Sequence, residues 1–311
     1  MPVPILLVTG FLGAGKTTVV NHLLAHAAGR QIAAVVNDFG SINIDAELIA
    51  GASDGVVSLA NGCICCSLEG DLLRTLATIL RRSPRPEAIV IETSGVADPS
   101  EIVRNLMDPV IWREAPLETV LCVMDATSSA DALNDALVRA QLRAADVVAL
   151  SKADLADAGG SQRVRAAVLA IRPAAVIVEA LHGQVPSALL FPEDPDHLPA
   201  PRDRGQRHPV SDRFESLSWT SQQPVSLSRL QAAIGQLAPR LARAKGLFET
   251  VEQPGSQLLF QLAGGRATLA PAGAPPPGLP RARIVFIAEI GVLSAAEIGR
   301  IMDSCASAGP Q

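Results

Sequence analysis

Gly10-Phe11-Leu12-Gly13-Ala14-Gly15-Lys16-Thr17-Thr18 is the stretch that decides the fold of this 311-residue chain. An apolar run, residues 5–8, precedes it, and a helix-forming run, residues 19–24, follows it. A buried strand, a glycine-rich turn, Lys-Thr and a helix form, in this order, the P-loop arrangement that holds phosphates. The glycines let the backbone curl around an oxyanion, and the amides of residues 13–17 then point into one concavity at the positive end of the helix dipole.

The residues of this loop have predicted roles toward a nucleotide. Lys16 would reach the β- and γ-phosphates, and the hydroxyl of Thr17 would bind a magnesium ion. The residues expected to hold the nucleotide here are Gly10, Gly13, Ala14, Gly15, Lys16, Thr17 and Thr18. The alternative is a glycine-rich turn with a solvated lysine, and it does not account for the strand and helix that flank the motif.

The composition allows large hydrophobic cores and has an acidic balance. The chain is 48% hydrophobic and its net charge is −5. A net negative charge argues against non-specific nucleic-acid binding, which uses a basic face. The apolar run before the P-loop is too short for a signal peptide or a membrane span. We therefore expect two domains in a cytoplasmic protein with no nucleic-acid partner and no membrane partner.

Two carboxylates follow apolar strands downstream of the P-loop. Residues 32–36 form an apolar run that leads into Asn-Asp-Phe-Gly, which contains Asp38. Asp38 could serve the magnesium shell or orient the attacking water, or it could belong to an ordinary turn. Residues 88–91 form a second apolar run that ends in Glu92, with Gly95 three residues later. This Walker-B-like ending would place Glu92 beside magnesium or the water and let the amide of Gly95 sense the γ-phosphate.

A later strand, residues 146–150, leads into a candidate base-recognition element. Ser151-Lys152-Ala153-Asp154 resembles the Asn-Lys-x-Asp element by which GTPases bind guanine. The carboxylate of Asp154 can accept from the ring N–H and the exocyclic amine of guanine, and the stem of Lys152 can lie over the base. Ser151 stands where asparagine is usual, so we expect one orienting hydrogen bond to be weaker. The alternative is a solvated helix start, which Ser and Asp favour.

Three of the five cysteines, Cys63, Cys65 and Cys66, fall within four positions. Thiols in a cytoplasmic protein stay reduced, so the cluster indicates metal binding or reactivity rather than a disulfide. On a loop, these thiolates can face one ion, and thiolates suit zinc, copper(I) or cobalt(II) better than magnesium. Three cysteines leave the fourth tetrahedral position for a donor from elsewhere or for exchange. Buried or redox-active cysteines are the alternative.

Apolar strands alternate with amphipathic helices up to about residue 178, which predicts an α/β fold with a doubly wound, mostly parallel sheet. Functional residues then gather at the carboxyl ends of the strands. We predict a P-loop domain over residues 1–185, a proline-rich linker over 186–210 and a smaller α+β domain over 211–311. In the last domain we expect strands at 214–219, 246–251, 257–262 and 284–287, helices at 227–241 and 294–304, a Pro/Gly loop at 271–280, and a capping box of Ser294 with Glu297.

These motifs, in this order, resemble the CobW-like family of metal-chaperone GTPases. The resemblance covers nearly the whole chain and is most specific at residues 10–18, 37–40, 63–66 and 92–99; Arg243-Ala244-Lys245-Gly246 and residues 285–287 resemble the family's C-terminal module. The resemblance implies magnesium-dependent GTP hydrolysis coupled to binding of a transition metal at the cysteines and its delivery to a client metalloprotein. The metal is usually zinc, with cobalt in the branch tied to cobalamin synthesis.

The chain departs from the family pattern in three places. Asp38 stands where glutamate is usual, Ser151 replaces asparagine, and the histidine-rich tract that many members carry between their domains is missing. Two other functions stay open from the sequence. One is a P-loop kinase or ATPase whose cysteines hold a structural zinc, and the other is a non-catalytic regulator that binds GTP and a partner through residues 214–305. A metal ligand shared across a homodimer would complete the site, although nothing in the sequence requires it.

Overall fold

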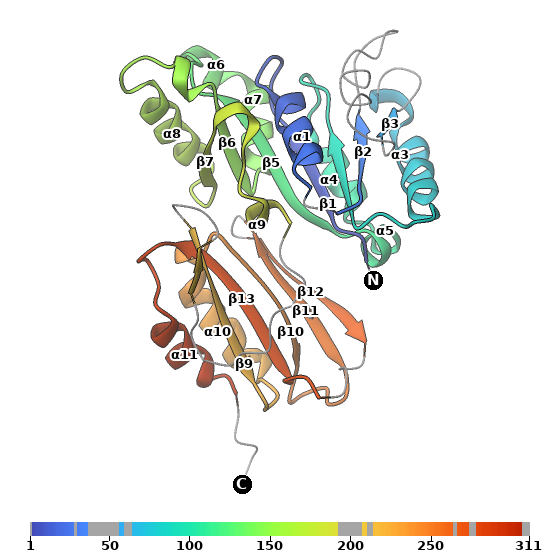
Figure 1. The fold of residues 1–311 in the computed structure, drawn as a ribbon, viewed down its shortest axis with the longest axis vertical. Helices are drawn as coiled ribbons and strands as arrows, with labels where there is room; N and C mark the ends of the chain where they lie inside the picture. Colours follow the sequence, from blue (N-terminus) through green and yellow to red (C-terminus); the bar gives the residue numbers. More distant parts are fainter. Residues whose placement is uncertain are drawn as a thin grey trace. The chain divides into compact units, whose positions relative to one another are not determined.

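The computed structural model describes residues 2–27, 30–36, 56–58, 64–191, 207–209, 214–263, 266–273 and 278–306, with only the backbone described at residues 56–58, 64–71, 130–131, 207–209 and 266. The chain forms two compact units, residues 1–191 and 192–311 (Figure 1). Among the described residues, none of the helices has the length and apolar character needed to cross a membrane.

A seven-stranded sheet forms the centre of the first unit, with strand order β3-β2-β4-β1-β5-β6-β7 and parallel pairing throughout. The strands β1, β4 and β6 are buried along their whole length, as continuous apolar runs in a sheet covered on both faces should be. This confirms the predicted α/β fold with a doubly wound sheet. The strands are β1 Ile5–Thr9, β2 Ile32–Val36, β3 Val56–Ser58, β4 Ala88–Glu92, β5 Leu117–Asp125, β6 Val147–Ser151 and β7 Val176–Ala180.

Helices connect these strands, and their apolar stripes pack on the sheet. In α3, the apolar residues Leu72, Leu76 and Ile79 are buried in one cluster with residues of β1, β2 and β4. The helices are α1 Lys16–Ala25, α3 Ile64–Leu80, α4 Pro99–Leu106, α5 Pro109–Glu114, α6 Ala130–Asn134, α7 Ala136–Ala144, α8 Gly160–Ile171 and α9 Ser187–Leu190, with short 3-10 turns η1 Ala153–Leu155 and η2 Leu181–Gly183.

The strand register lines up the carboxyl ends at one edge of the sheet. Glu92 at the end of β4 pairs with Val36 of β2, and Val36 pairs with Ser58 of β3. Farther along the sheet, Asp125 of β5 pairs with Ser151 of β6. The chain therefore leaves β3, β4, β5 and β6 at the same edge, which is where a parallel α/β sheet places its functional residues.

The structure differs from the sequence predictions in several places of the first unit. The helix α3 begins at Ile64, so Cys65 and Cys66 lie in its first turn rather than on a loop before it. Past residue 185, the chain still packs on this unit, because the hydroxyl of Thr119 donates to the carbonyl of Leu190 over 2.9 Å. An apolar Leu-Leu-Phe run at 189–191 supplies the buried side chains that hold this segment.

The second unit is a six-stranded antiparallel sheet with helices on one face, in strand order β12-β11-β10-β13-β9-β8. This confirms the predicted smaller α+β part. Its elements are β8 Arg207–Pro209, β9 Phe214–Ser221, α10 Leu227–Leu237, the 3-10 turn η4 Ala238–Arg240, β10 Arg243–Glu249, β11 Gln257–Ala263, β12 Arg266–Gly273, β13 Ala282–Glu289 and α11 Ala295–Asp303.

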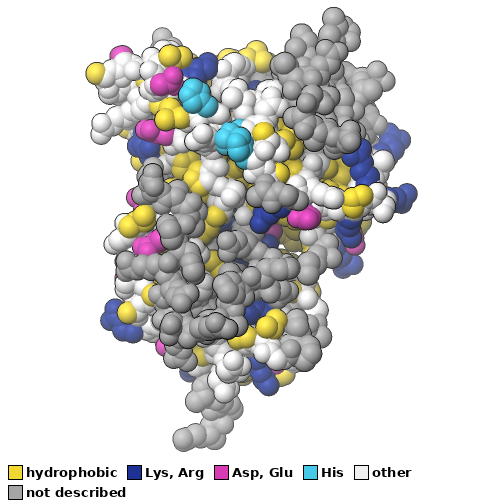
Figure 2. Space-filling model, in the orientation of Figure 1, with side chains coloured by type: hydrophobic (Ala, Val, Ile, Leu, Met, Phe, Trp, Pro, Cys, Tyr) yellow, Lys and Arg dark blue, Asp and Glu magenta, His cyan; other side chains and the backbone are white. Residues whose placement is uncertain are grey.

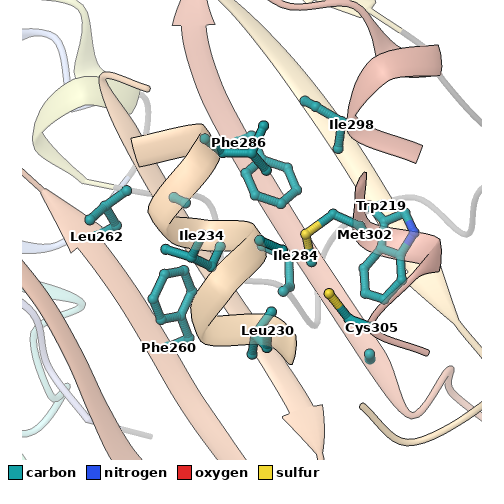
Figure 3. Close-up of a cluster of buried hydrophobic side chains, with 14 of the residues drawn as sticks. Trp219, Leu230, Ile234, Phe260, Leu262, Ile284, Phe286, Ile298, Met302 and Cys305 are labelled. Atoms are coloured by element: carbon teal, nitrogen blue, oxygen red, sulfur yellow. The ribbon is translucent and has the colours of Figure 1, made fainter. Parts of the chain in front are cut away.

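The core of this unit lies between the sheet and its two long helices. Figure 3 shows Ile234 of α10 and Met302 of α11 among side chains from the sheet, including Ile284 and Phe286. Trp219 of β9 is buried there, and its indole N–H donates to a carboxylate oxygen of Asp303 over 2.9 Å. This bond satisfies the polar atom of a side chain that is otherwise apolar.

Three predictions for the second unit need correction. The helix expected over 227–241 ends at Leu237, and Pro239 lies in the turn η4, because proline removes a helical N–H. The strand β12 runs through Pro271 to Gly273, where a loop was expected. Ser294 caps α11 by accepting from the backbone N–H of Glu297, as predicted, but the carboxylate of Glu297 binds Arg240 at 2.6 Å.

Candidate nucleotide site

The P-loop runs between β1 and α1 in a conformation that requires its glycines. Gly10, Gly13 and Gly15 all have positive φ angles, of 139°, 70° and 93°. A Cβ at Gly10 would lie 2.2 Å from the carbonyl oxygen of Val123, so the turn out of β1 has no room for a side chain. At Gly13, no atom of the other described residues, its two chain neighbours aside, lies within 4 Å of the position that a Cβ would take. The positive φ angle, rather than crowding, therefore explains this glycine.

Lys16 and Thr17 begin α1 and take defined positions. The ammonium of Lys16 donates to the carbonyl of Phe11 over 3.2 Å, so the loop curls over its own lysine. The hydroxyl of Thr17 donates to a carboxylate oxygen of Glu92 over 2.9 Å. Glu92 is only 2% exposed. Two oxygen ligands of the kind that Mg²⁺ prefers therefore meet at this point, and the donor set fits a magnesium ion.

The loop after β4 lies directly against the P-loop. A Cβ on Gly95 would come within 2.7 Å of the backbone nitrogen of Leu12, so only glycine allows this approach. The side-chain amide of Gln141, on α7, donates to the carbonyls of Gly95 and Ala97 over 3.2 and 3.3 Å. Gln141 is 1% exposed. It holds the loop that carries Gly95, and sequence reasoning missed it because a glutamine in an amphipathic helix carries no signal of burial.

The base-recognition element connects to both the P-loop and β5. The hydroxyl of Ser151 donates to the carbonyl of Ala14 over 2.6 Å and lies 3.3 Å from the carbonyl of Met124. The serine thus reaches the P-loop directly, and the weaker orienting hydrogen bond expected at Ser151 stays a prediction. Lys152 has a φ of 54° and directly precedes the turn η1. Asp154 lies in η1, and its side chain is exposed.

Lys152 forms an ion pair with Asp125 at the end of β5. The distance between Lys152 Nζ and Asp125 Oδ2 is 2.6 Å, and Thr127 donates to the other oxygen of Asp125 from its amide and its hydroxyl. Burial opposes ionisation of Asp125, but the hydrogen bonds from Lys152 and Thr127 outweigh it and lower the pKa of this carboxyl. The carboxylate thus fixes the lysine whose stem is expected to lie over the base.

A second segment at this edge was also missed from the sequence. The turn η2, which follows β7, packs on α1, and a Cβ on Gly183 would lie 2.6 Å from the carbonyl oxygen of Thr18. His182, next to it, has a φ of 51°. The sequence signal for this close approach is Gly183, three residues after the end of β7.

The remaining predicted site residues are described only in part. Asp38 and Cys63 lie outside the described residues, and for Cys65 and Cys66 the structure gives the helical backbone of α3 alone. Within the described part of the chain, no group of three or more His, Cys, Asp or Glu side chains is arranged to hold a metal ion. The metal-binding role of the cysteines therefore stays a prediction.

Comparison with known proteins identifies the class to which this fold and site belong. The family model of the CobW/HypB/UreG nucleotide-binding domain matches residues 4–179, and that of the cobalamin synthesis protein cobW C-terminal domain matches residues 214–306. The chain belongs to the CobW/HypB/UreG family of nucleotide-binding proteins and carries the CobW C-terminal domain. The family resemblance seen in the sequence motifs is thereby confirmed.

Individual relatives cover most of the chain. It is 31% identical over 310 residues to the zinc chaperone CobW of Sinorhizobium sp, a match that covers 85% of this chain and 86% of that protein. It is 30% identical over 275 residues to the zinc chaperone YjiA of Escherichia coli K12, covering 84% and 86%. The crystal structure of the Zn(II)-bound YjiA GTPase from E. coli matches with a TM-score of 0.50 and 23% identity over 99% of this chain and 100% of that one, which is a likeness of fold.

Proposed function

We propose that this protein is a magnesium-dependent GTPase that binds a transition metal, zinc in the first place, through Cys63, Cys65 and Cys66 and delivers it to a client metalloprotein. Membership of the family supports the nucleotide-binding part of the proposal. Relatives named zinc chaperones, 30–31% identical over most of the chain, support the choice of metal and of a chaperone role.

The nucleotide chemistry would be carried by residues of the P-loop and β4. Lys16 and the loop amides would hold the β- and γ-phosphates, and Gly95 would sense the γ-phosphate through its backbone amide. The hydroxyl of Thr17 and the carboxylate of Glu92 would ligate the magnesium ion, and Asp38 is the third candidate in this shell. A bound Mg²⁺ supplies positive charge against the phosphate oxygens, where negative charge develops during transfer.

Guanine specificity would come from residues 151–154. The exposed carboxylate of Asp154 can accept from guanine, and Lys152 is held by Asp125 on the side of β5. Ser151 ties this element to Ala14 of the P-loop, so that base and phosphate recognition share one hydrogen-bonded unit.

The proposal that nucleotide binding and metal binding are coupled rests on one observation. In the strand register, Ser58 of β3 pairs with Val36 of β2, and Val36 pairs with Glu92 of β4. Adjacent strands lie about 4.8 Å apart, so the chain leaves β3 toward the cysteines about 10 Å from the predicted magnesium ligand Glu92. A change in the γ-phosphate region that shifts the segments leaving β3 and β4 could therefore alter the thiolate site directly. Such order changes in loops next to a γ-phosphate are a common form of switch.

The test is the zinc affinity of the full-length protein, measured by competition with a chromogenic chelator, with a non-hydrolysable GTP analogue, with GDP and without nucleotide. We expect an affinity that depends on the nucleotide in the wild type and is lost in the Cys65→Ala, Cys66→Ala double variant. Cys305→Ala is the matched control, because it removes a buried thiol of the second unit. Equal zinc affinity in all nucleotide states would end the coupling proposal.

The same protein samples separate the competing functions. A zinc that only supports the fold would make the melting temperature collapse on chelation and leave the affinity indifferent to nucleotide. Competition by cobalt in the same assay ranks the two metals. Asp154→Asn should weaken GTP binding and leave ATP binding unchanged, whereas a kinase or ATPase would bind ATP in preference from the start.

A further inference from the structure

Two histidines stand one turn apart at the carboxyl end of the P-loop helix. His22 lies in the last turn of α1 and His26 caps it, so they are spaced i and i+4 and share one face. Their rings are stacked, with centroids 4.0 Å apart and planes inclined by 21°. His22 is half-buried and His26 is exposed. The space-filling view in Figure 2 shows histidine side chains, in cyan, at the surface of the first unit.

The tautomer of His26 follows from its hydrogen bond. Its ring nitrogen Nδ1 lies 2.9 Å from the carbonyl oxygen of His22. A carbonyl oxygen only accepts, so in the neutral ring this contact favours the tautomer with the proton on Nδ1 and the lone pair on Nε2. Metal-binding histidines are commonly fixed in this way, with one ring nitrogen donating to a backbone carbonyl and the other facing the ion.

The electrostatics at this helix end favour a bound cation over a second imidazolium. Burial first, and then the charge of a protonated His26, lower the pKa of His22, so this ring is neutral near physiological pH. A neutral imidazole is the form that binds metals. The carbonyls of the last turn of α1 add a partial negative charge at this helix end, which attracts cations.

We propose that His22 and His26 form a two-imidazole binding site for a borderline divalent cation of the Zn²⁺, Ni²⁺ or Cu²⁺ class, separate from the cysteine cluster. Two nitrogens on one tetrahedral ion with bonds of about 2.05 Å are about 3.3 Å apart. The ring centroids are 4.0 Å apart and the rings are nearly parallel, so binding requires both rings to turn until one nitrogen of each faces the ion. Among the described residues no third His, Cys, Asp or Glu side chain joins them, so the proposed site would take its remaining ligands from water.

This inference does not depend on the proposed GTPase or chaperone function, since it concerns imidazoles on α1 and not the thiolates. It has one consequence for the molecule as a whole. The helix that carries the cation at its carboxyl end carries Lys16 and Thr17 at its amino end. An ion held there would sit on the same rigid element as the phosphate-binding residues.

The experiment uses the full-length chain with Cys63, Cys65 and Cys66 replaced by serine, so that thiolates do not contribute. Ni²⁺ is titrated by calorimetry without nucleotide, in the parent and in the His22→Gln and His26→Gln variants. We expect one site in the parent and at least about tenfold weaker binding in each variant, because each removes one of two chelating nitrogens. Lowering the pH from about 7.5 to about 5.5 should abolish the site as the imidazoles become protonated.

His182→Asn is the matched control, because it removes an exposed imidazole that has no ring partner in its own turn and asparagine tolerates its φ of 51°. The control should bind Ni²⁺ as the parent does. Unchanged affinity in both His22→Gln and His26→Gln, or an equal loss in His182→Asn, would overturn the proposal. His26→Gln decides the matter if His22→Gln lowers the melting temperature, since His26 is exposed.

Discussion

The hydroxyl of Ser151, at the end of β6, donates to the carbonyl of Ala14 in the P-loop over 2.6 Å. Both groups are buried, and Ser151 also lies 3.3 Å from the carbonyl of Met124 on β5. One side chain thus ties the phosphate-binding loop to two strands of the sheet. The P-loop is held in shape from the side of the predicted base site as well as by its own glycines.

Ser151→Ala should loosen the P-loop. The change leaves the carbonyl of Ala14 buried without this donor, which costs about 1–3 kcal/mol. We expect a lower melting temperature and several-fold weaker GTP binding, measured by calorimetry and by displacement of a fluorescent nucleotide. Ser228→Ala, at an exposed position on α10, is the control and should change neither quantity. Nucleotide affinity equal to that of the wild type would show that the loop keeps its shape without Ser151.

Glu92→Gln tests the predicted magnesium site. In the wild type the hydroxyl of Thr17 donates to the carboxylate of Glu92 over 2.9 Å. The amide oxygen of glutamine can still accept this hydrogen bond, but the substitution removes the negative charge. We therefore expect the fold to persist and the Mg²⁺ concentration for half-maximal GTP hydrolysis to rise at least about tenfold. Glu101→Gln, exposed on α4, serves as the matched control. An unchanged Mg²⁺ dependence in Glu92→Gln would remove Glu92 from the metal shell.

Gln141→Leu should release the loop that carries Gly95. The carbonyls of Gly95 and Ala97 would lose a buried donor, at a cost of about 1–3 kcal/mol. Hydrogen exchange of residues 94–97 should accelerate in the variant, and GTP turnover should fall more than GTP binding. The exposed Gln162→Leu on α8 controls for the loss of a glutamine. If exchange in this loop stays as slow as in the wild type, Gln141 does not hold it.

The sequence was sufficient for those features that local patterns determine. Continuous apolar runs predicted β1, β2 and β4 closely, and the glycine spacing predicted the P-loop, because both depend on residues adjacent in the chain. Because the carboxyl ends of parallel strands meet at one edge of a sheet, the sequence also predicted that Thr17 and Glu92 lie close together.

Contacts between distant residues could not be predicted in this way. The bond from Ser151 to Ala14 depends on how closely β6 approaches the P-loop, so comparison with the usual asparagine did not predict it. The burial of Gln141 follows from the packing of α7 on the loop after β4. Glu297 was expected to complete a capping box, but Arg240, 57 positions away in the sequence, takes its carboxylate.

Cys122 should behave as an inert core residue. It is 1% exposed on β5, and burial raises the pKa of its thiol to about 12, against a small opposing effect of Lys16. Only the thiolate is reactive, so iodoacetamide at about pH 8 should leave Cys122 unmodified in the native protein and modify it in urea. Peptide mass spectrometry measures both states. Rapid native modification of Cys122 would mean that β5 opens to solvent.

Asp125→Asn should remove a pH-dependent contribution to stability. The folded protein lowers the pKa of Asp125, since the bonds from Lys152 and Thr127 outweigh the opposing effect of burial. A carboxyl with a lowered folded pKa stabilises the fold above its unfolded pKa of about 3.9, and this stabilisation is lost as the pH falls through the folded value. Urea unfolding should therefore show wild type more stable than Asp125→Asn near neutral pH, with the difference shrinking as the pH falls below about 4.

The control is Asp157→Asn, whose ion pair with Arg163 is exposed and should contribute little at any pH. A difference between wild type and Asp125→Asn that does not change with pH would mean that the carboxylate acts through packing and not through its charge.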